Sequence, residues 1–364
     1  MFLKKILAQK QKTLYNIIET KQAELRRLML TPENIKKTMR ENELIVRILS
    51  EYINNHPRFL TKDMVNDLAG DCNVTTDDAF RTLLCAACGL DTAEERYHRY
   101  LEQSYFLPGL HKLSPADYSE DDYNRHIRFP SKSLGSWEFC HHSYHPYQPF
   151  VCNHPVLTKE LREIPQIGYF EEEFPFPAVL ENGVEWMTVT PNEVETMRDP
   201  IAQSHGRVVT LGLGLGYYAF HASQKDDVES VTVVERDPNV ISLFKEYILP
   251  QFPHKDKIKI LECDAFDFMK SKLEDESADF LFADLWHDAS DGLDMYLEIK
   301  KHEKAYEHTR FSYWIEPSLL SVLRQMVYER ITDPKEPLIL RNVPMEELLS
   351  NEFLKTLNLT KETT

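Results

Sequence analysis

The stretch RVVTLGLGLG, residues 207–216, decides the fold class of this 364-residue chain. Its apolar first half, Val208 to Leu211, predicts a short buried strand. Gly212, Gly214 and Gly216 follow at the carboxyl end of that strand, where glycines let the backbone turn tightly and approach a ligand at the start of a helix. Residues 214–219, GLGYYA, also fit the relaxed dinucleotide pattern G-x-G-x-x-A. The stretch therefore predicts a site for a nucleotide-like ligand without saying which one.

Strand and helix patterns alternate regularly after these glycines. Further strands are expected at 230–234, 257–261 and 278–283, and helices at 217–223, 239–247, 265–272 and 293–308. Such alternation predicts an α/β fold with a Rossmann-like, doubly wound parallel sheet. Ligands of these sheets bind at the carboxyl ends of the strands.

Carboxylates end the second and third predicted strands. Glu235 lies roughly 20 positions after the glycines, where an acidic residue can accept hydrogen bonds from both ribose hydroxyls. Asp237 either extends that contact or caps the helix that starts at Pro238. After the third strand, Asp264 could hold an adenine amino group, while Ala265 and the aromatic Phe266 would cover the ring.

The fourth predicted strand ends in the most chemically varied segment of the chain. Asp284 is followed by Trp286, His287 and Asp288, so two carboxylates, an imidazole and an indole lie at the mouth of the sheet. His287 could act as a base, and Asp284 or Asp288 could orient an amine or hydroxyl group. The alternative is a structural histidine, which is the commoner role of a lone histidine after a strand.

Together, these strand ends resemble those of the class I S-adenosylmethionine-dependent methyltransferases, over about residues 166–320. Within that superfamily they are most similar to the spermidine-synthase-like branch. The resemblance implies S-adenosylmethionine as cofactor, with the glycines facing its methionine part and Glu235 its ribose. Asp264 and Ala265 would face the adenine, and Asp284 the sulfonium and the acceptor.

The resemblance leaves several functions open. A methyltransferase acting on a small molecule or a protein is the leading hypothesis. An aminopropyltransferase would use decarboxylated S-adenosylmethionine, but residues 286–292, WHDASDG, keep the carboxylates of its polyamine loop without the prolines. A dinucleotide-dependent oxidoreductase and a non-catalytic cofactor-binding module are the remaining alternatives.

The rest of the chain divides into expected parts by composition. Residues 1–105 predict an N-terminal helical domain, with Thr31 capping a helix that starts at Pro32. Residues 106–165, dense in Pro, His and Tyr, suggest an irregular linker or capping segment. Residues 166–364 predict a β-hairpin around Asn182-Gly183, the Rossmann-like domain and C-terminal helices at 317–331 and 345–357. An antiparallel edge strand is either missing or built from residues 337–340.

The charge and the apolar content of the chain limit which binding partners are expected. A formal net charge of −17 disfavours nucleic acid, which needs a basic face, so a small-molecule or protein substrate is expected. There is no apolar run of ~18 residues and no secretory signal, which predicts a cytoplasmic protein without a membrane span. The helical N-terminus could mediate a homodimer. Six cysteines over this length do not suggest a disulfide framework.

Two further sets of residues allow a functional and a structural interpretation. Cys85 and Cys88 have zinc-like spacing, and a Cys/His-rich stretch covers residues 140–154, yet buried cysteines on a helix are the commoner case and no metal is expected. Five aromatic residues either line a substrate pocket or, as we favour, form a seam between domains: Tyr144, Tyr147, Phe150, Tyr169 and Phe170.

Overall fold

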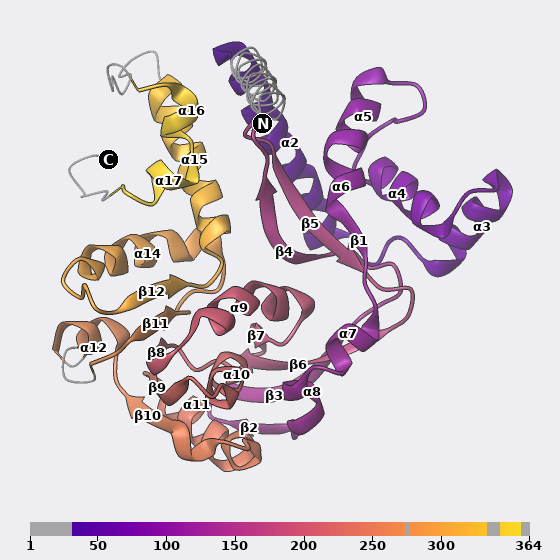
Figure 1. Ribbon diagram of the computed structural model, residues 1–364. Coiled ribbons are helices and arrows are strands. Elements are labelled where there is room, and N and C mark those ends of the chain that lie inside the picture. The colour runs from indigo at the N-terminus through magenta and orange to yellow at the C-terminus, as the bar shows by residue number, and fades with distance from the viewer. Residues whose placement is uncertain (1–30, 272, 274–276, 333–342, 358–364) are drawn as a thin grey trace, which may run out of the picture.

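The computed structural model describes residues 31–271, 273, 277–332 and 343–357. Figure 1 shows a parallel sheet at the lower left, N-terminal helices at the upper right and an antiparallel sheet below those helices. The helices expected before residue 31 and the edge strand considered at 337–340 lie outside the described residues. Within the described part of the chain, no helix is both long and apolar enough to cross a membrane.

The parallel sheet has five strands in the order β10-β9-β8-β11-β12. They are β8 (Gly206–Leu211), β9 (Val228–Glu235), β10 (Ile258–Glu262), β11 (Phe280–Ala283) and β12 (Arg310–Tyr313). Each neighbouring pair is parallel, with β8 bonded to β9 on one side and β11 on the other. The three central strands, β9, β8 and β11, are dense in buried Val, Leu and Phe, as strands covered on both faces require. The predicted α/β fold is confirmed.

Helices connect the strands in the predicted alternation: α10 (Tyr217–Gln224), α11 (Pro238–Leu243), α12 (Ala265–Ser271) and α14 (Ala289–Glu303). A π-helical turn, η2 (Phe244–Ile248), continues α11, and two 3-10 turns, η3 (Leu249–Gln251) and η4 (Lys255–Lys257), lead into β10. The chain moves outward from β8 to β10 and then crosses back to β11. With right-handed crossovers, this reversal puts α10 and α11 on one face and α12 and α14 on the other, and opens a crevice between β8 and β11.

The hairpin predicted before this sheet is confirmed. β6 (Phe174–Glu181) and β7 (Val184–Thr188) pair antiparallel, and Asn182 and Gly183 between them both have positive φ, as a two-residue type I′ turn requires. The hairpin is half of a four-stranded sheet, order β2-β3-β6-β7, with β2 (Lys132–Leu134) and β3 (Trp137–Tyr144). Helix α9 (Pro191–Gln203) then leads from β7 to β8.

The expectation of an irregular segment at 106–165 is wrong in its secondary structure. Besides β2 and β3, these residues form α7 (Pro115–Ser119), α8 (Asp122–His126), β1 (Leu110–Lys112), β4 (Phe150–Leu157) and the start of β5 (Glu163–Tyr169). Strand β3 pairs with β6, whose residues lie about 40 positions later, and β4 pairs with β5 through two register shifts. Strands that pair with distant partners, and whose register shifts at bulges, need not show a regular alternation of apolar and polar residues in the sequence.

The N-terminal helices build a core of their own. They are α2 (Pro32–Asn55), α3 (Lys62–Cys72), α4 (Thr76–Ala87) and α5 (Arg96–Leu101), the last continuing through the π-helical η1 (Glu102–Phe106) and α6 (Leu107–Gly109). Thr31 caps α2 as predicted, since its hydroxyl accepts from the backbone N–H of Asn34. Tyr147 and Tyr169 join this helical core, whereas Phe170 belongs to the large core around the parallel sheet.

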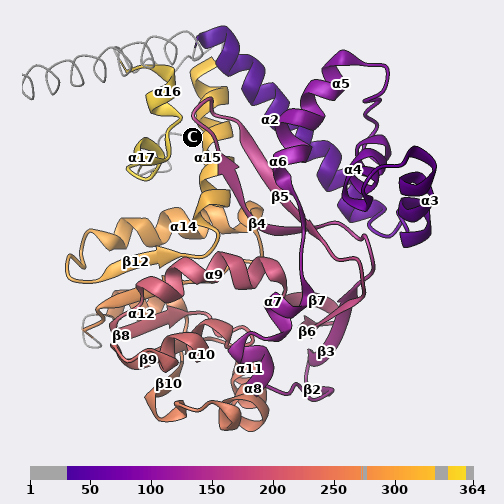
Figure 2. The ribbon, with the colours of Figure 1, turned by 45° about the vertical axis from the view of Figure 1, so that its right-hand side comes forward.

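A buried ion pair joins the C-terminal helices to the rest of the fold. Helix α15 (Glu316–Thr332) runs beside β4, β5 and α2 (Figure 2), followed by the short helices α16 (Met345–Leu348) and α17 (Asn351–Leu354) in place of the single one expected at 345–357. Arg324 on α15 bonds Glu163 of β5, and its Nε donates to the carbonyl of Leu349 at 2.7 Å. Ser321 donates to the other oxygen of Glu163 at 2.5 Å. Arg324 is 1% exposed and Glu163 6%, so neither charge is solvated by water.

We expect Arg324→Met to lower the free energy of unfolding by ~3–5 kcal/mol, because Glu163 would stay buried without its guanidinium partner. Adding Glu163→Gln should recover much of that loss, since the unpaired charge is removed. Urea unfolding measures both values. Lys301→Met, which breaks an exposed pair with Glu298, is the control and should change stability by less than ~1 kcal/mol. Equal effects of Arg324→Met and Lys301→Met would contradict the prediction.

Candidate functional site

A cavity of about 730 Å³ opens at the carboxyl ends of the parallel strands and extends toward the β6–β7 hairpin. Its volume lies in the range of small-molecule sites. Most residues predicted from the sequence to form the site line it together: Gly212, Gly214, Glu235, Asp237, Asp264, Ala265, Asp284 and His287. Residues at the ends of β8, β9, β10 and β11 therefore line one common cavity.

Glu235 is held by backbone N–H groups of two strand ends. Its Oε1 accepts from Arg236 at 2.8 Å and Asp237 at 2.9 Å, and its Oε2 accepts from Leu213 in the glycine-rich loop at 3.2 Å. Each carboxylate oxygen has two lone pairs, so Oε2 keeps acceptor capacity for a ligand hydroxyl. These bonds fix the carboxylate at the edge of the cavity.

Asp237 and Asp264 combine a capping role with a place in the cavity lining. Asp237 caps α11 by accepting from the backbone N–H groups of Asn239 and Val240 through Oδ1, which is the alternative that the sequence left open. Asp264 caps α12 in the same way, also through Oδ1. In both residues the second oxygen makes none of these capping bonds. Ala265 and Phe266 line the cavity beside Asp264.

Two residues predicted for the site are not among those that line the cavity. Gly216 has a φ of +80° and starts α10, where a Cβ would collide with the ring of Phe244, so its place in the fold explains the glycine. Asp288 caps α14 by accepting from the backbone and hydroxyl of Ser290, in a capping box with Asp291. Asp291, which the sequence did not single out, lines the cavity instead.

Asp284 directly follows β11, next to the glycine-rich loop that follows β8. Gly212 has a φ of +97°, and a Cβ there would collide with the carbonyl oxygen of Asp284. The glycine thus lets the backbone at the end of β11 approach the glycine-rich loop closely. Burial raises the pKa of Asp284 to about 7. A carboxyl group with that pKa can take up or release a proton near neutral pH.

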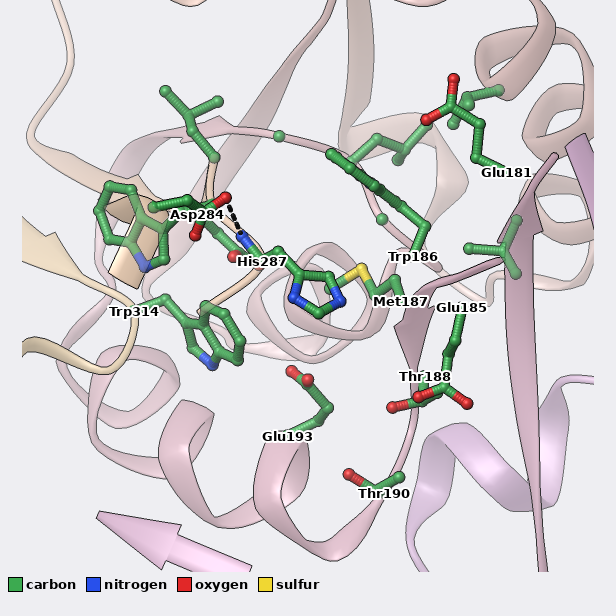
Figure 3. A pocket seen from close by; sticks show the side chains of 18 of the residues that line it. Glu181, Glu185, Trp186, Met187, Thr188, Thr190, Glu193, Asp284, His287 and Trp314 are labelled. Atoms are coloured by element: carbon green, nitrogen blue, oxygen red, sulfur yellow. Dashed lines mark hydrogen bonds between the residues drawn. The ribbon is translucent and has the colours of Figure 1, made fainter. Parts of the chain in front are cut away.

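His287 and Met187 approach the cavity from its two walls. The ring of His287 lies 6.2 Å from that of Trp186 on the hairpin, and its backbone N–H donates to Asp291 at 3.2 Å. Met187 of β7 covers Gly214 so closely that a Cβ on this glycine would collide with its sulfur. The hairpin therefore lies directly over the glycine-rich loop. Figure 3 shows Met187 and Trp186 of the hairpin among the side chains that line the cavity.

The sequence identifies only one residue, Tyr144, of the opposite wall, which we call the hairpin side. It consists of residues from β3, β7, the start of α9 and the end of β12: Trp137, Tyr144, Glu185, Trp186, Glu193 and Trp314. Two signals were available: the hairpin's position before the α/β domain, and the aromatic residues for which a substrate pocket was one interpretation. Of the five aromatic residues considered above, Tyr144 and Phe150 line the cavity, while the other three pack in cores.

Glu193 is the least expected member of this wall. Its side chain lies on the first turn of α9, is 7% exposed, and points into the cavity toward the rings of Trp314 and His287 (Figure 3). Its Oε2 has no hydrogen-bond partner among the residues that the structure describes. Burial, and then the nearby carboxylates of Asp284 and Glu185, raise the pKa of Glu193 well above its usual value.

The cavity is strongly acidic. Eight of the described lining residues carry a carboxyl group, and Arg236 is the only Lys or Arg among them: the acidic residues are Glu181, Glu185, Glu193, Glu235, Asp237, Asp264, Asp284 and Asp291. Such a space favours a ligand that brings positive charge.

The cysteines lie away from this chemistry except for Cys263, which lines the cavity. Cys85 and Cys88 are on or next to the end of α4, where burial raises the pKa of Cys85 above its usual value and that of Cys88 to about 12. Cys152 is buried on β4. Across the described residues, no group of three or more His, Cys, Asp or Glu side chains is placed to hold a metal ion.

The raised pKa of Asp284 predicts how stability changes with pH. The folded carboxyl keeps its proton up to about pH 7, whereas the unfolded one loses it near ~3.9, so unfolding releases a proton between these values. Rising pH then favours the unfolded state by up to ~1.4 kcal/mol per pH unit. Urea unfolding from about pH 5 to pH 9 should show wild type losing stability relative to Asp284→Asn up to about pH 7 and no further loss above it.

Asp288→Asn is the matched control for that series. Burial raises the pKa of Asp288, but hydrogen bonds from Ser290 outweigh this, so its pKa is lowered overall. The stability that Asp288 contributes is lost only as pH falls through its folded pKa, below the interval measured. A constant difference between wild type and Asp284→Asn across the interval would show that Asp284 titrates like an exposed carboxyl.

No family model matches this sequence, and no curated protein matches it either. Distant likenesses to solved structures exist, at identities of 14–17%. A proposed O-methyltransferase from Klebsiella pneumoniae is 17% identical with a TM-score of 0.25, covering 35% of this chain and 62% of that one. MNMC2 from Aquifex aeolicus is 17% identical with a TM-score of 0.26, covering 43% and 61%.

Shikimate dehydrogenase from Mycobacterium tuberculosis is 14% identical with a TM-score of 0.23, covering 42% of this chain and 64% of that one. This chain thus spans less than two thirds of the length of each of the three proteins. At these TM-scores the likenesses carry no argument about function, which has to come from the residues of the cavity.

Proposed function

We propose that this protein is a transferase of the S-adenosylmethionine-dependent methyltransferase type, acting on a small molecule or a protein. The observation that carries the proposal is the cavity itself, which joins Gly212, Gly214, Glu235, Asp264 and Asp284 in one space at the switch point of the sheet. A glycine-rich loop supplies backbone, and three strand ends supply carboxylates. These are the same residues on which the sequence resemblance to the methyltransferases rests.

The residues present fit the cofactor in size and in donor chemistry. Glu235 keeps acceptor capacity for ribose hydroxyls, and Asp264 has a carboxylate oxygen beyond its capping bonds for an adenine amino group. Ala265 and Phe266 supply an apolar wall for the base, and Gly212 and Gly214 expose backbone for the methionine part. When bound, S-adenosylmethionine supplies an electrophilic methyl carbon on a sulfonium.

The chain's own residues have defined tasks in this proposal. Asp284, with its pKa of about 7, can take the proton of an acceptor amine or hydroxyl. His287, half-exposed and lining the cavity, is the second candidate base. Asp288 is assigned to capping α14 instead of catalysis, because its oxygen accepts from Ser290 and it does not line the cavity.

A second candidate function is aminopropyl transfer from decarboxylated S-adenosylmethionine. The observation that favours it is the charge of the cavity, where Arg236 is the only Lys or Arg among the described lining residues. Decarboxylated S-adenosylmethionine has no carboxylate to be repelled by this acidic wall. The two candidates therefore differ in which cofactor binds, and binding can separate them.

We expect Glu235→Ala to weaken S-adenosylhomocysteine binding by at least ~tenfold, because a charged acceptor for the ribose hydroxyls is lost. Titration calorimetry measures this with S-adenosylmethionine, S-adenosylhomocysteine, decarboxylated S-adenosylmethionine and NAD. Glu229→Ala, on the same strand but exposed at its other end and outside the cavity lining, is the control and should leave binding unchanged.

Each result of that titration assigns a function. Binding of S-adenosylmethionine and S-adenosylhomocysteine that Glu235→Ala weakens supports a methyltransferase. Binding of only the decarboxylated form selects aminopropyl transfer, and binding of NAD alone would overturn both proposals.

A further inference from the structure

The glycine-rich loop after β8 is held in part by residues that lie outside the parallel sheet. Gly214, which lines the cavity, and Gly216, which starts α10, both have a positive φ, of +51° and +80°. Glycine loses more conformational freedom on ordering than any other residue, so such a loop needs fixed contacts to keep one shape. On the cavity side, the backbone N–H of Leu213 supplies one contact by donating to Glu235.

Tyr123 of α8 supplies a second contact from outside the cavity lining. Its hydroxyl group donates to the backbone carbonyl of Leu215. Helix α10 begins after Gly216, and its first bond runs from the N–H of Phe220 to the carbonyl of Gly216, so the carbonyl of Leu215 lies just outside the helical hydrogen bonds. Because Leu215 is buried, its carbonyl needs a partner within the protein. Tyr123, which is buried as well, is that partner.

Tyr123 is itself fixed, because α8 is attached to α10 beside it, as Figure 1 and Figure 2 both show. Asp121, which caps α8, accepts from the hydroxyl of Tyr217 and lies 3.1 Å from Nε2 of His221. Burial raises the pKa of Asp121, but bonds from His221 and then from its other partners outweigh this, so the pKa is lowered overall. The ring of Tyr123 meets those of Tyr217 and Phe220 edge to face, each at 5.3 Å between centroids.

We propose that Tyr123 is a positioning residue, which orders the glycine-rich loop for the cofactor while Asp121 holds α8 in place. This rests on the proposed function, in which that loop faces the methionine part of S-adenosylmethionine. Tyr123 is not among the residues that line the cavity, so it acts through the backbone of Leu215. A loop that is already ordered loses less conformational freedom when a ligand binds, so this contact raises the affinity for the part of the cofactor that the loop faces.

The proposal predicts that removing the hydroxyl of Tyr123 affects one half of the cofactor. S-adenosylhomocysteine contains the amino-acid part that would face the loop. Methylthioadenosine lacks that part and keeps the ribose and the adenine, which are assigned to Glu235 and Asp264. A loosened loop should therefore weaken binding of S-adenosylhomocysteine much more than binding of methylthioadenosine. If Tyr123 only stabilised the fold, the two ligands would respond alike.

The test is titration calorimetry of the full chain with these two ligands. Tyr123→Phe keeps the ring and removes only the hydroxyl donor, and it should weaken S-adenosylhomocysteine binding by at least ~fivefold while changing methylthioadenosine binding by less than ~twofold. Tyr118→Phe is the matched control, because Tyr118 on α7 is also buried and its hydroxyl donates at 3.4 Å to Glu195 of α9, which is not part of the loop. It should bind both ligands as wild type does.

Amide hydrogen exchange gives a second readout that needs no ligand. Within the loop, the N–H of Gly216 donates to the carbonyl of Leu213 at 2.9 Å. Without the hydroxyl of Tyr123 this bond should open more often, so the amides of residues 213–216 should exchange at least ~fivefold faster in Tyr123→Phe. The amides of residues 231–233, in the middle of β9, should keep their wild-type rates in that variant, and Tyr118→Phe should keep them in both segments.

The inference is overturned if Tyr123→Phe leaves S-adenosylhomocysteine binding unchanged, weakens both ligands equally, or leaves exchange in the loop unchanged. Equal weakening in Tyr118→Phe would overturn it as well. If wild type binds only decarboxylated S-adenosylmethionine, that ligand takes the place of S-adenosylhomocysteine in the same comparison. Failure of the proposed function is seen separately, as a wild type that binds none of these ligands. The exchange rates then decide alone whether Tyr123 orders the loop.

Discussion

The close approach of Gly212 to the carbonyl of Asp284 is the constraint on which the site depends. It joins the glycine-rich loop after β8 to the end of β11, the two strands between which the strand order reverses. A side chain at Gly212 would force these strand ends apart. Leu213, the next residue, donates to Glu235 and thereby ties β9 into the same arrangement. One backbone contact and one hydrogen bond thus fix three of the four strand ends around the cavity.

The cavity concentrates acidic groups that a stable fold would normally keep in water. Glu235, Asp237 and Asp264 offset this cost through hydrogen bonds from backbone N–H groups. For Asp284 and Glu193, burial instead raises the pKa, so each carboxyl group keeps its proton to a higher pH than it would in water. Glu163, by contrast, is neutralised by Arg324 within the protein. This buried ion pair therefore stabilises the fold and is not part of the site.

Prediction from sequence succeeded where a pattern is local. The Asn182-Gly183 turn has a backbone requirement that the structure meets. Gly212, Gly214 and the strand-end carboxylates lie together along the cavity, where their roles toward a ligand stay predictions. Prediction failed at residues 106–165, where strands form only by pairing with distant partners. It also assigned Gly216 and Asp288 to the ligand, whereas the first accommodates the ring of Phe244 and the second caps a helix. Those roles depend on neighbours that no spacing in the chain reveals.

The sequence by itself determined the alternation of strands and helices, the parallel sheet and the wall of the cavity built from strand ends, because carboxyl ends of parallel strands must meet at one edge. Only the tertiary structure decided the opposite wall. Glu193 and Trp314 lie 121 residues apart in the chain, at the ends of different elements, and neither stands in a motif. Packing of the hairpin and α9 over the glycine-rich loop buries them together. Burial and proximity are properties of the fold, and they change a carboxyl group from a surface charge into a proton-holding acid.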